Sequence, residues 1–146
     1  MDVNFYDAVD DALLKFAVIV SRYRGQWVFC KHRERNTFEA PGGHRERGEE
    51  IEAAAKRELF EETGASRYVL RPVCAYGVAD SGRTETFGML YYADILAFGR
   101  LPESEIETVR LFDALPTEWT YPLIQPKLIQ KVWEVVFKNM EKPPRD

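Results

Sequence analysis

The sequence lacks the marks of a secreted or membrane-embedded protein. Its first residues, MDVNFYDAVDDALL, are acidic and have neither the basic start nor the long apolar stretch of a secretory signal. The longest aliphatic run, near Phe16–Val20, is too short to cross a bilayer. We therefore expect no secretory signal and no membrane association.

Cysteine and histidine are scarce. Cys30 and Cys74 lie in apolar, strand-like segments without CxxC spacing, so we expect two buried free thiols and a reducing, cytoplasmic environment. His32 and His44 are the only histidines, and two are too few for a histidine-based metal site.

An excess of positive charge is also missing. The 146 residues hold 20 Lys+Arg against 24 Asp+Glu, a net charge of −4, which argues weakly against a protein that coats nucleic acid. Residues 43–65 alone carry seven acids and four bases, so most of the negative excess lies in one short segment. That concentration needs a physical reason.

The composition is typical of one globular domain, which we place at residues 1–146 with a frayed charged tail at 138–146. Segments rich in β-branched and aromatic residues predict strands at Leu13–Ser21, Gln26–His32, Tyr68–Val78, Thr86–Leu96 and Val109–Phe112. The first two are expected to form a hairpin. Helices are predicted at Glu49–Thr63, stopped by Gly64, and at Pro126–Phe137. This order of elements predicts an α/β sandwich on a mixed sheet.

Three glutamates gather on one face of the helix predicted at residues 49–63. At about 100° per residue, Glu58, Glu61 and Glu62 fall in a roughly 100° arc that overlaps the apolar stripe around Leu59. They also lie in the last two turns, where the helix dipole disfavours negative charge. A solvated, glutamate-rich helix face is the alternative. A bound divalent cation would remove the conflict, and clustered carboxylates suit Mg²⁺ or Mn²⁺.

The segment that holds these glutamates resembles the box that defines the Nudix hydrolases. The box reads Gly, five residues, Glu, seven residues, Arg-Glu-aliphatic, any residue, Glu-Glu, any residue, Gly and an aliphatic residue. Residues 43–65 read GHRERGEEIEAAAKRELFEETGA and match eight defining positions, with Ala65 in place of the larger aliphatic residue. A chance match at a given start is on the order of one in 10⁹.

The resemblance implies a Nudix-type α/β/α sandwich with a central mixed sheet. It also implies Mg²⁺-dependent hydrolysis, with Mn²⁺ as a substitute, of a nucleoside diphosphate linked to another group. By matching position, the implied metal ligands are the Gly43 carbonyl, Glu49, Glu58, Glu61 and Glu62, and the implied catalytic residues are Arg57, Glu58 and Glu61. Glu49 either ligates the metal or holds the loop, and Arg57 orients carboxylates.

The residue that accepts the proton of the attacking water varies within the family. Glu58 is one candidate, and Glu103, Glu105 and Glu107 are the others, although each of these three also suits a solvated loop.

Basic residues flank the strand and turn that lead into the box. Arg33, Arg35 and Arg45, with Lys31 and His32, are candidates for binding substrate phosphates, against the alternative of solvated loop charges. Aromatic residues that could stack a base, or simply pack in the core, are Tyr6, Phe38, Tyr76 and Phe87. Trp119 and Trp133 are expected to pack in the core.

Signatures of several Nudix subgroups are absent. Ala79-Asp80-Ser81 stands where the ADP-ribose group has Pro, and Ser81-Gly82-Arg83 stands where the dinucleoside polyphosphate group has Tyr. The NADH and coenzyme A signatures are also missing. A MutT-like set remains, acting on nucleoside triphosphates, oxidised purine nucleotides or RNA 5′ ends. The stretch 121–126 has no Asn, which oxidised-guanine enzymes often carry ahead of the final helix.

We therefore expect a divalent-metal-dependent pyrophosphohydrolase of a nucleoside triphosphate or an oxidised purine nucleotide of the 8-oxo-dGTP type, acting by water attack at phosphorus. The alternatives are an RNA 5′-pyrophosphohydrolase and a non-catalytic nucleotide-sensing Nudix domain. Homodimers are common in this fold, but nothing in the sequence marks an interface.

Overall fold

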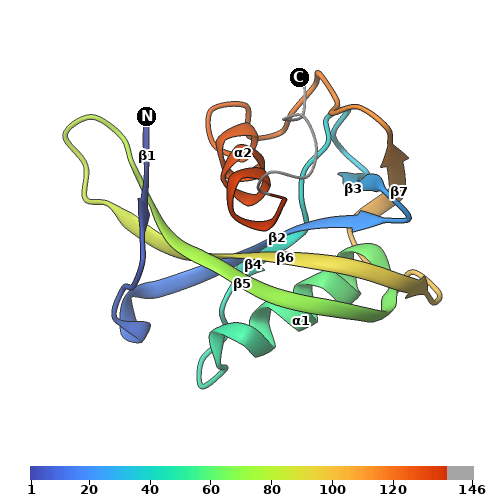
Figure 1. Cartoon of the computed structure of the whole chain (residues 1–146), viewed down its shortest axis with the longest axis horizontal. Helices are drawn as coiled ribbons and strands as arrows, with labels where there is room; N and C mark the ends of the chain where they lie inside the picture. Colours follow the sequence, from blue (N-terminus) through green and yellow to red (C-terminus); the bar gives the residue numbers. More distant parts are fainter. Residues whose placement is uncertain (138–146) are drawn as a thin grey trace.

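A mixed β-sheet between two helices forms the protein (Figure 1), and the computed structural model describes residues 1–137. The strands run in the order β1-β5-β6-β2-β3-β7, and β4 pairs with β2 outside that path. They are β1 (Asp2–Tyr6), β2 (Leu14–Tyr23), β3 (Gln26–His32), β4 (Gly42–His44), β5 (Ala65–Ala79), β6 (Thr86–Phe98) and β7 (Ile106–Phe112). The pairing of β2 with β6 is parallel and the other pairings are antiparallel, so the predicted mixed sheet is confirmed.

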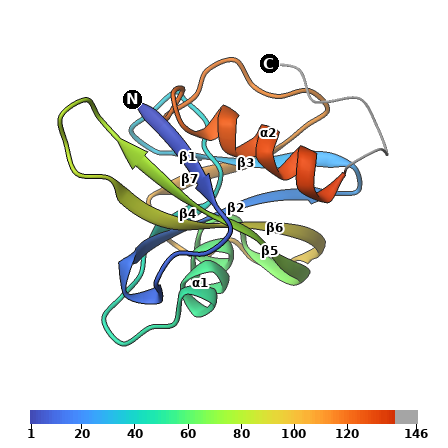
Figure 2. The same cartoon turned by 60° about the vertical axis from the view of Figure 1, so that its left-hand side comes forward.

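The two helices cover opposite faces of the sheet. Helix α1 (Ile51–Thr63) lies on one face and α2 (Gln125–Val136) on the other (Figures 1 and 2). Gly64 ends α1 with a left-handed backbone, φ +75°, and donates its N–H to the Phe60 carbonyl at 2.9 Å, as predicted. Both predicted helices are therefore confirmed, and the tail predicted at 138–146 lies outside the described residues.

Each face of the sheet has its own core. Against α1 the buried core is mainly aliphatic, with Ile19 and Val28 of the sheet and Ala55 and Leu59 of the helix, and Tyr91 is its one buried aromatic residue among those described. Against α2 it is rich in aromatic residues, namely Trp27, Phe29, Tyr76, Tyr92, Trp119 and Trp133. The expected packing roles of Trp119 and Trp133 are confirmed, as are the two buried free cysteines. Among residues 1–137, no helix has the length and apolar character needed to span a bilayer.

Two strands are missing from the sequence-based prediction. Strand β1 pairs antiparallel with the end of β5, Asp2 opposite Ala79 and Tyr6 opposite Ala75. Strand β4 contains the glycine pair that otherwise suggests only a turn. This strand can pair with β2 at close range because Gly42 has no side chain. A Cβ at Gly42 would lie 2.5 Å from the Ala17 carbonyl oxygen.

Candidate active site

The loop before α1 brings the first box residue directly onto the helix. Gly43 pairs with Ala17 of β2 and lies over the carboxylate of Glu58, where an added Cβ would come within 2.6 Å of Glu58 Oε1. A larger residue at this position would push the Glu58 carboxylate aside, because the nearest atoms all belong to that side chain. The first position of the box therefore limits where the Glu58 carboxylate can lie, and its carbonyl is also a candidate ligand.

Arg57 organises three of the box carboxylates. Its Nε and Nη2 donate to Glu49 Oε2 and Oε1 at 2.8 and 2.9 Å, and its Nη1 donates to Glu58 Oε1 at 2.7 Å. Nη1 is also 3.5 Å from Glu61 Oε1. The hydrogen bonds from Arg57 lower the pKa of Glu49 to about 2, and those to Glu49 raise the pKa of Arg57. The predicted orienting role of Arg57 is consistent with this geometry.

Glu58 and Glu62 are the shielded members of the glutamate cluster. Their side chains are only 13% and 12% exposed, whereas that of Glu61 is 47% exposed. Glu62 accepts the Gly42 N–H at 2.8 Å, yet burial and the nearby Glu58 and Glu39 raise its pKa to about 8. Burial also raises the pKa of Glu58, against the opposing effect of Arg57. Burial therefore imposes an electrostatic cost on both carboxylates that their hydrogen bonds from Arg57 and Gly42 offset only in part.

The donor set suits a hard divalent cation. Carboxylate and backbone carbonyl oxygens are the ligands of Mg²⁺, and a cation would offset the burial of Glu58 and Glu62. Within residues 1–137, however, no three His, Cys, Asp or Glu side chains are gathered as a formed metal site. Arg57 contacts Glu49, Glu58 and Glu61. The residues fit the cation in their chemistry.

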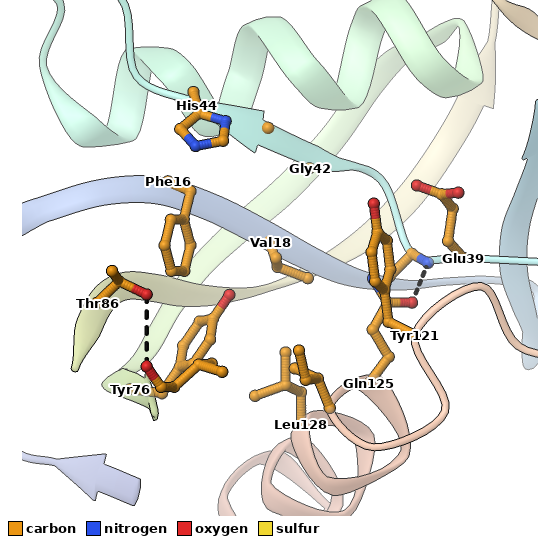
Figure 3. A pocket seen from close by; sticks show the side chains of 14 residues that line it. Phe16, Val18, Glu39, Gly42, His44, Tyr76, Thr86, Tyr121, Gln125 and Leu128 are labelled. Carbon is orange, nitrogen blue, oxygen red and sulfur yellow. Dashed lines mark hydrogen bonds between the residues drawn. The ribbon is translucent and has the colours of Figure 1, made fainter. Parts of the chain in front are cut away.

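A cavity of about 320 Å³ opens beside this cluster (Figure 3). Strand β4 forms its wall on the side of α1, and the start of α2 forms the opposite wall. Apolar and aromatic residues dominate the lining, namely Phe16, Val18, Tyr76, Val78, Ile124 and Leu128. Because Gly43 both lines the cavity and contacts Glu58, the cavity and the carboxylates share a boundary. A concave apolar slot with few polar groups is typical of a small-molecule site.

The wall near α2 is held by hydrogen bonds to the first residue of the helix and to the loop before it. Gln125, 4% exposed, accepts the Ala40 N–H at 2.7 Å (Figure 3). The neighbouring backbone is joined as well, since Phe38 N–H donates to the Glu118 carbonyl at 2.9 Å. These bonds join residues 38–40 to residues 118–125 beside the cavity.

A second cavity, of about 230 Å³, has a charged lining: His32, Arg33, Glu34, Arg35 and Glu105. It adjoins the first cavity through Arg35, which hydrogen-bonds Tyr121 and donates to Glu39 Oε1 at 3.4 Å. Tyr121 and Glu39 both line the first cavity. The imidazole of His32, which lines the second cavity, lies near both Glu39 and Glu62. Its Nε2 is 3.5 Å from Glu39 Oε2 and 3.7 Å from Glu62 Oε2.

The structure brings together some of the remaining predicted residues and separates others. Arg33 and Arg35 line the second cavity, whereas Arg45 pairs with Asp11 at 3.1 Å. Among the three other candidate bases, Glu105 Oε2 lies 3.6 Å from His32 Nδ1, whereas Glu107 lies in β7 and pairs with Lys31. Of the aromatic candidates, Tyr76 lines the first cavity, while Tyr6 packs on Phe87 and Phe38 on Phe112.

Sequence reasoning missed Glu39, Tyr121 and Gln125. One signal was available for Glu39, a charged residue between Phe38 and Ala40 in an otherwise apolar segment just before the box. Tyr121 and Gln125 reach the cavity only through the docking of the 118–125 loop, which no local pattern predicts.

The chain is similar in sequence and in fold to known proteins. The family model of the NUDIX domain matches residues 13–133. The protein named "Putative 8-oxo-dGTP diphosphatase YtkD" of Bacillus subtilis (strain 168) is 28% identical over 134 aligned residues, covering 82% of this chain and 83% of the relative. The crystal structure of the Bacillus subtilis pyrophosphohydrolase BsRppH has a TM-score of 0.75 at 26% identity and 90% coverage of each chain. A MutT NUDIX hydrolase from Burkholderia pseudomallei shares the fold, with a TM-score of 0.57 at 20% identity, over 80% of this chain and 95% of that one.

Proposed function

Because this chain belongs to the NUDIX domain family, we propose that it is a divalent-metal-dependent pyrophosphohydrolase that cleaves a nucleoside triphosphate by water attack at phosphorus. One observation carries the proposal: Gly43 joins the cavity of about 320 Å³ to the carboxylate of Glu58. A nucleoside bound in this cavity would have its phosphates next to the box. Phe16 and Tyr76 would contact the base, and Leu128 would bound it from the side of α2.

Nudix hydrolases generally need divalent metal ions, and we propose Mg²⁺ here. The Gly43 carbonyl, Glu58, Glu61 and Glu62 would hold it, with Glu49 close by. When bound, Mg²⁺ supplies charge neutralisation of the phosphates and a more acidic water. Arg57 keeps Glu49 and Glu58 in place through its bonds of 2.7 to 2.9 Å.

Glu58 is the proton acceptor that the geometry favours. Its carboxylate lies at the cavity boundary, next to the place proposed for the phosphates. Glu105 is further out, with a side chain that is 90% exposed. Glu58 would take the proton of the attacking water on one of its carboxylate oxygens as the water oxygen bonds to phosphorus. The phosphoanhydride P–O bond at that phosphorus breaks at the same time, and the bridging oxygen leaves with the departing phosphate or pyrophosphate group.

The proposed substrate is a nucleoside triphosphate, including an oxidised purine of the 8-oxo-dGTP type. The relative named as an 8-oxo-dGTP diphosphatase supports this class. Gln125 supplies a buried side-chain amide in the stretch that lacks the Asn of oxidised-guanine enzymes. Arg33 and Arg35 of the second cavity would attract the far end of the phosphate chain.

An RNA 5′-pyrophosphohydrolase is the second candidate. The observation that favours it is the second cavity, which adjoins Glu39 and Tyr121 and offers space beyond the first nucleoside. A further nucleotide with its negatively charged phosphate could enter beside Arg33 and Arg35. Hydrolysis of triphosphorylated oligonucleotides faster than of free nucleotides would favour this candidate.

The test is a hydrolysis panel with Mg²⁺ and with Mn²⁺, covering normal and oxidised nucleoside triphosphates, sugar nucleotides and triphosphorylated RNA. We expect the wild type to release phosphate or pyrophosphate from nucleoside triphosphates. Glu58→Gln should lower kcat at least about 100-fold, because a ligand and a base are lost together.

Glu52→Gln is the matched control on the same helix. Glu52 points to solvent, 57% exposed and paired with Lys56, so turnover should stay at the wild-type level. Unchanged turnover in Glu58→Gln would exclude the mechanism. Tight nucleotide binding in calorimetry without any product would instead identify a sensing domain.

A further inference from the structure

Glu39 is an acidic residue outside the Nudix box that the box chemistry leaves unexplained. We propose that its carboxylate binds, directly or through one water, the divalent cation that Glu62 also binds. The inference rests on the proposed function and extends it, because it adds a metal-site residue from the segment before β4.

The burial of Glu39 is the first argument. It is 6% exposed, and no other Asp or Glu of residues 1–137 is shielded to the same degree; the Glu58 and Glu62 side chains are 13% and 12% exposed. Its side-chain partners make only long contacts: Arg35 Nη1 donates to Oε1 at 3.4 Å, and the imidazole Nε2 of His32 is 3.5 Å from Oε2. Strong charge-assisted hydrogen bonds are about 2.7–2.9 Å long, which is the range of the Arg57 bonds to Glu49. The Glu39 carboxylate is therefore buried without a partner that compensates it well.

The backbone of Glu39 ties this residue to the sheet. Glu39 is held by its backbone, which exchanges hydrogen bonds with Cys30 at 2.9 and 3.0 Å. Its neighbour Phe38 packs against the core, and Ala40 belongs to it. A neutral residue of similar size would satisfy the same backbone contacts, so the charge itself calls for a functional reason.

The position of the carboxylate gives that reason. His32 Nε2 is 3.5 Å from Glu39 Oε2 and 3.7 Å from Glu62 Oε2, so two acids flank one imidazole nitrogen. Figure 3 shows the Glu39 carboxylate on the side of the cavity formed by β4, pointing away from Leu128 and α2. Glu39 therefore faces the box and not the part of the cavity that would hold the base.

The chemistry of a carboxylate narrows what it can bind there. An ionised carboxylate only accepts hydrogen bonds, and it repels a phosphate unless a cation stands between them. Base and ribose donors would lie on the other side, towards Leu128. A cation shared with Glu62 satisfies both acids at once, and hard divalent cations take several carboxylate or water oxygens.

The experiment titrates Mn²⁺ into metal-free protein and follows the free ion by electron paramagnetic resonance. Glu39→Gln keeps the size and removes the charge, and we expect its Mn²⁺ affinity to fall about 10–100-fold, as for other residues that support metal sites. The thermal midpoint of metal-free Glu39→Gln should be equal to or above that of the wild type, because a poorly compensated buried charge is gone. Glu39→Asp, which keeps the charge, should recover part of the affinity.

Glu118→Gln is the matched control, because Glu118 is exposed and contributes only its backbone carbonyl to Phe38. Its Mn²⁺ affinity should equal that of the wild type. Wild-type affinity in Glu39→Gln, or a lowered thermal midpoint with unchanged affinity, would overturn the proposal and make Glu39 a structural partner of Arg35. The titration uses no nucleotide. If the hydrolysis panel fails while Glu39→Gln still loses Mn²⁺, the proposed function falls and the role of Glu39 stands.

Discussion

The two faces of the sheet differ in the size of the side chains that pack against their helices. On the α1 face, the fully buried Ala54 and Ala55 let the helix backbone approach the sheet closely. On the α2 face, large rings such as Phe29 and Trp133 fill the space, and a cavity remains beside them. Small side chains therefore hold the charged edge of α1 at a fixed place, while bulky ones leave room for a ligand. Reaction chemistry and ligand recognition are divided between the two faces.

The strongest test of this division removes a large ring from the α2 face. Phe29 is fully buried and packs edge-on against Phe112 and Trp119, with ring centroids 5.7 and 5.1 Å apart. We expect Phe29→Ala to lower the free energy of unfolding by about 3–5 kcal/mol, because a large cavity is left. Urea denaturation measures the change. Phe60→Ala on the exposed side of α1 is the control, at about 0.5 kcal/mol or less; an equal loss in both variants would refute the aromatic core as the source of stability.

Adding bulk to the α1 face should have a smaller effect on stability and a larger one on turnover. Ala55→Leu forces extra methylene groups between α1 and the sheet and should cost about 1–3 kcal/mol. The same displacement moves Glu58 and Glu62 relative to β4, so kcat should fall while KM changes little. Ala53→Leu, on the exposed side of the helix, is the matched variant. If Ala55→Leu destabilises the protein but keeps wild-type kcat, α1 is not a rigid support for the site.

The smallest expected effect concerns the buried charge itself. The pKa of Glu62 is raised from 4.5 to about 8, so the folded protein binds a proton that the unfolded chain releases between these pH values. Stability of the metal-free protein should therefore fall as pH rises from about 4.5 to about 8. Glu62→Gln should make stability less dependent on pH and raise the free energy of unfolding at pH 8 by on the order of 1 kcal/mol. The amide oxygen of Gln still accepts the Gly42 N–H, although less strongly than a carboxylate does.

Thermal unfolding at a series of pH values measures this slope. Glu49 provides an internal contrast, because its pKa is lowered to about 2 and its contribution is lost only as pH falls from about 4.5 towards 2. If the wild type and Glu62→Gln lose stability with rising pH to the same extent, Glu62 is not the source of this pH dependence.

Local features of the fold could be predicted from the sequence. The β2–β3 hairpin, α1 with its stop at Gly64, and the box all depend on residues close together in the chain. Strand β1 could not be predicted, because five residues with little pattern become a strand only by pairing with residues 75–79. The length of β5, which begins at Ala65, was likewise set by its partner β6.

The site followed the same rule. Box residues were found because their spacing on one helix is local, and Arg57 joins three of them. The environment of Glu39 was hidden, since it depends on His32 and Glu62 approaching from different elements. The position of Arg45 beside the box suggests a phosphate ligand. In the structure Arg45 pairs with Asp11 of the 3₁₀ turn before β2, and no local sequence pattern predicts that contact.

The two buried thiols have a practical consequence for studying the enzyme. Burial raises the pKa of both Cys30 and Cys74, so neither carries much thiolate at neutral pH, and Cys30 also donates to the Glu39 carbonyl at 3.4 Å. Maleimide reagents react with accessible thiolates, so neither Cys30 nor Cys74 should be labelled in the native state. A single cysteine placed on the exposed loop at residues 80–83 would then accept one fluorophore, giving a ratio of one label per chain without removing either native thiol.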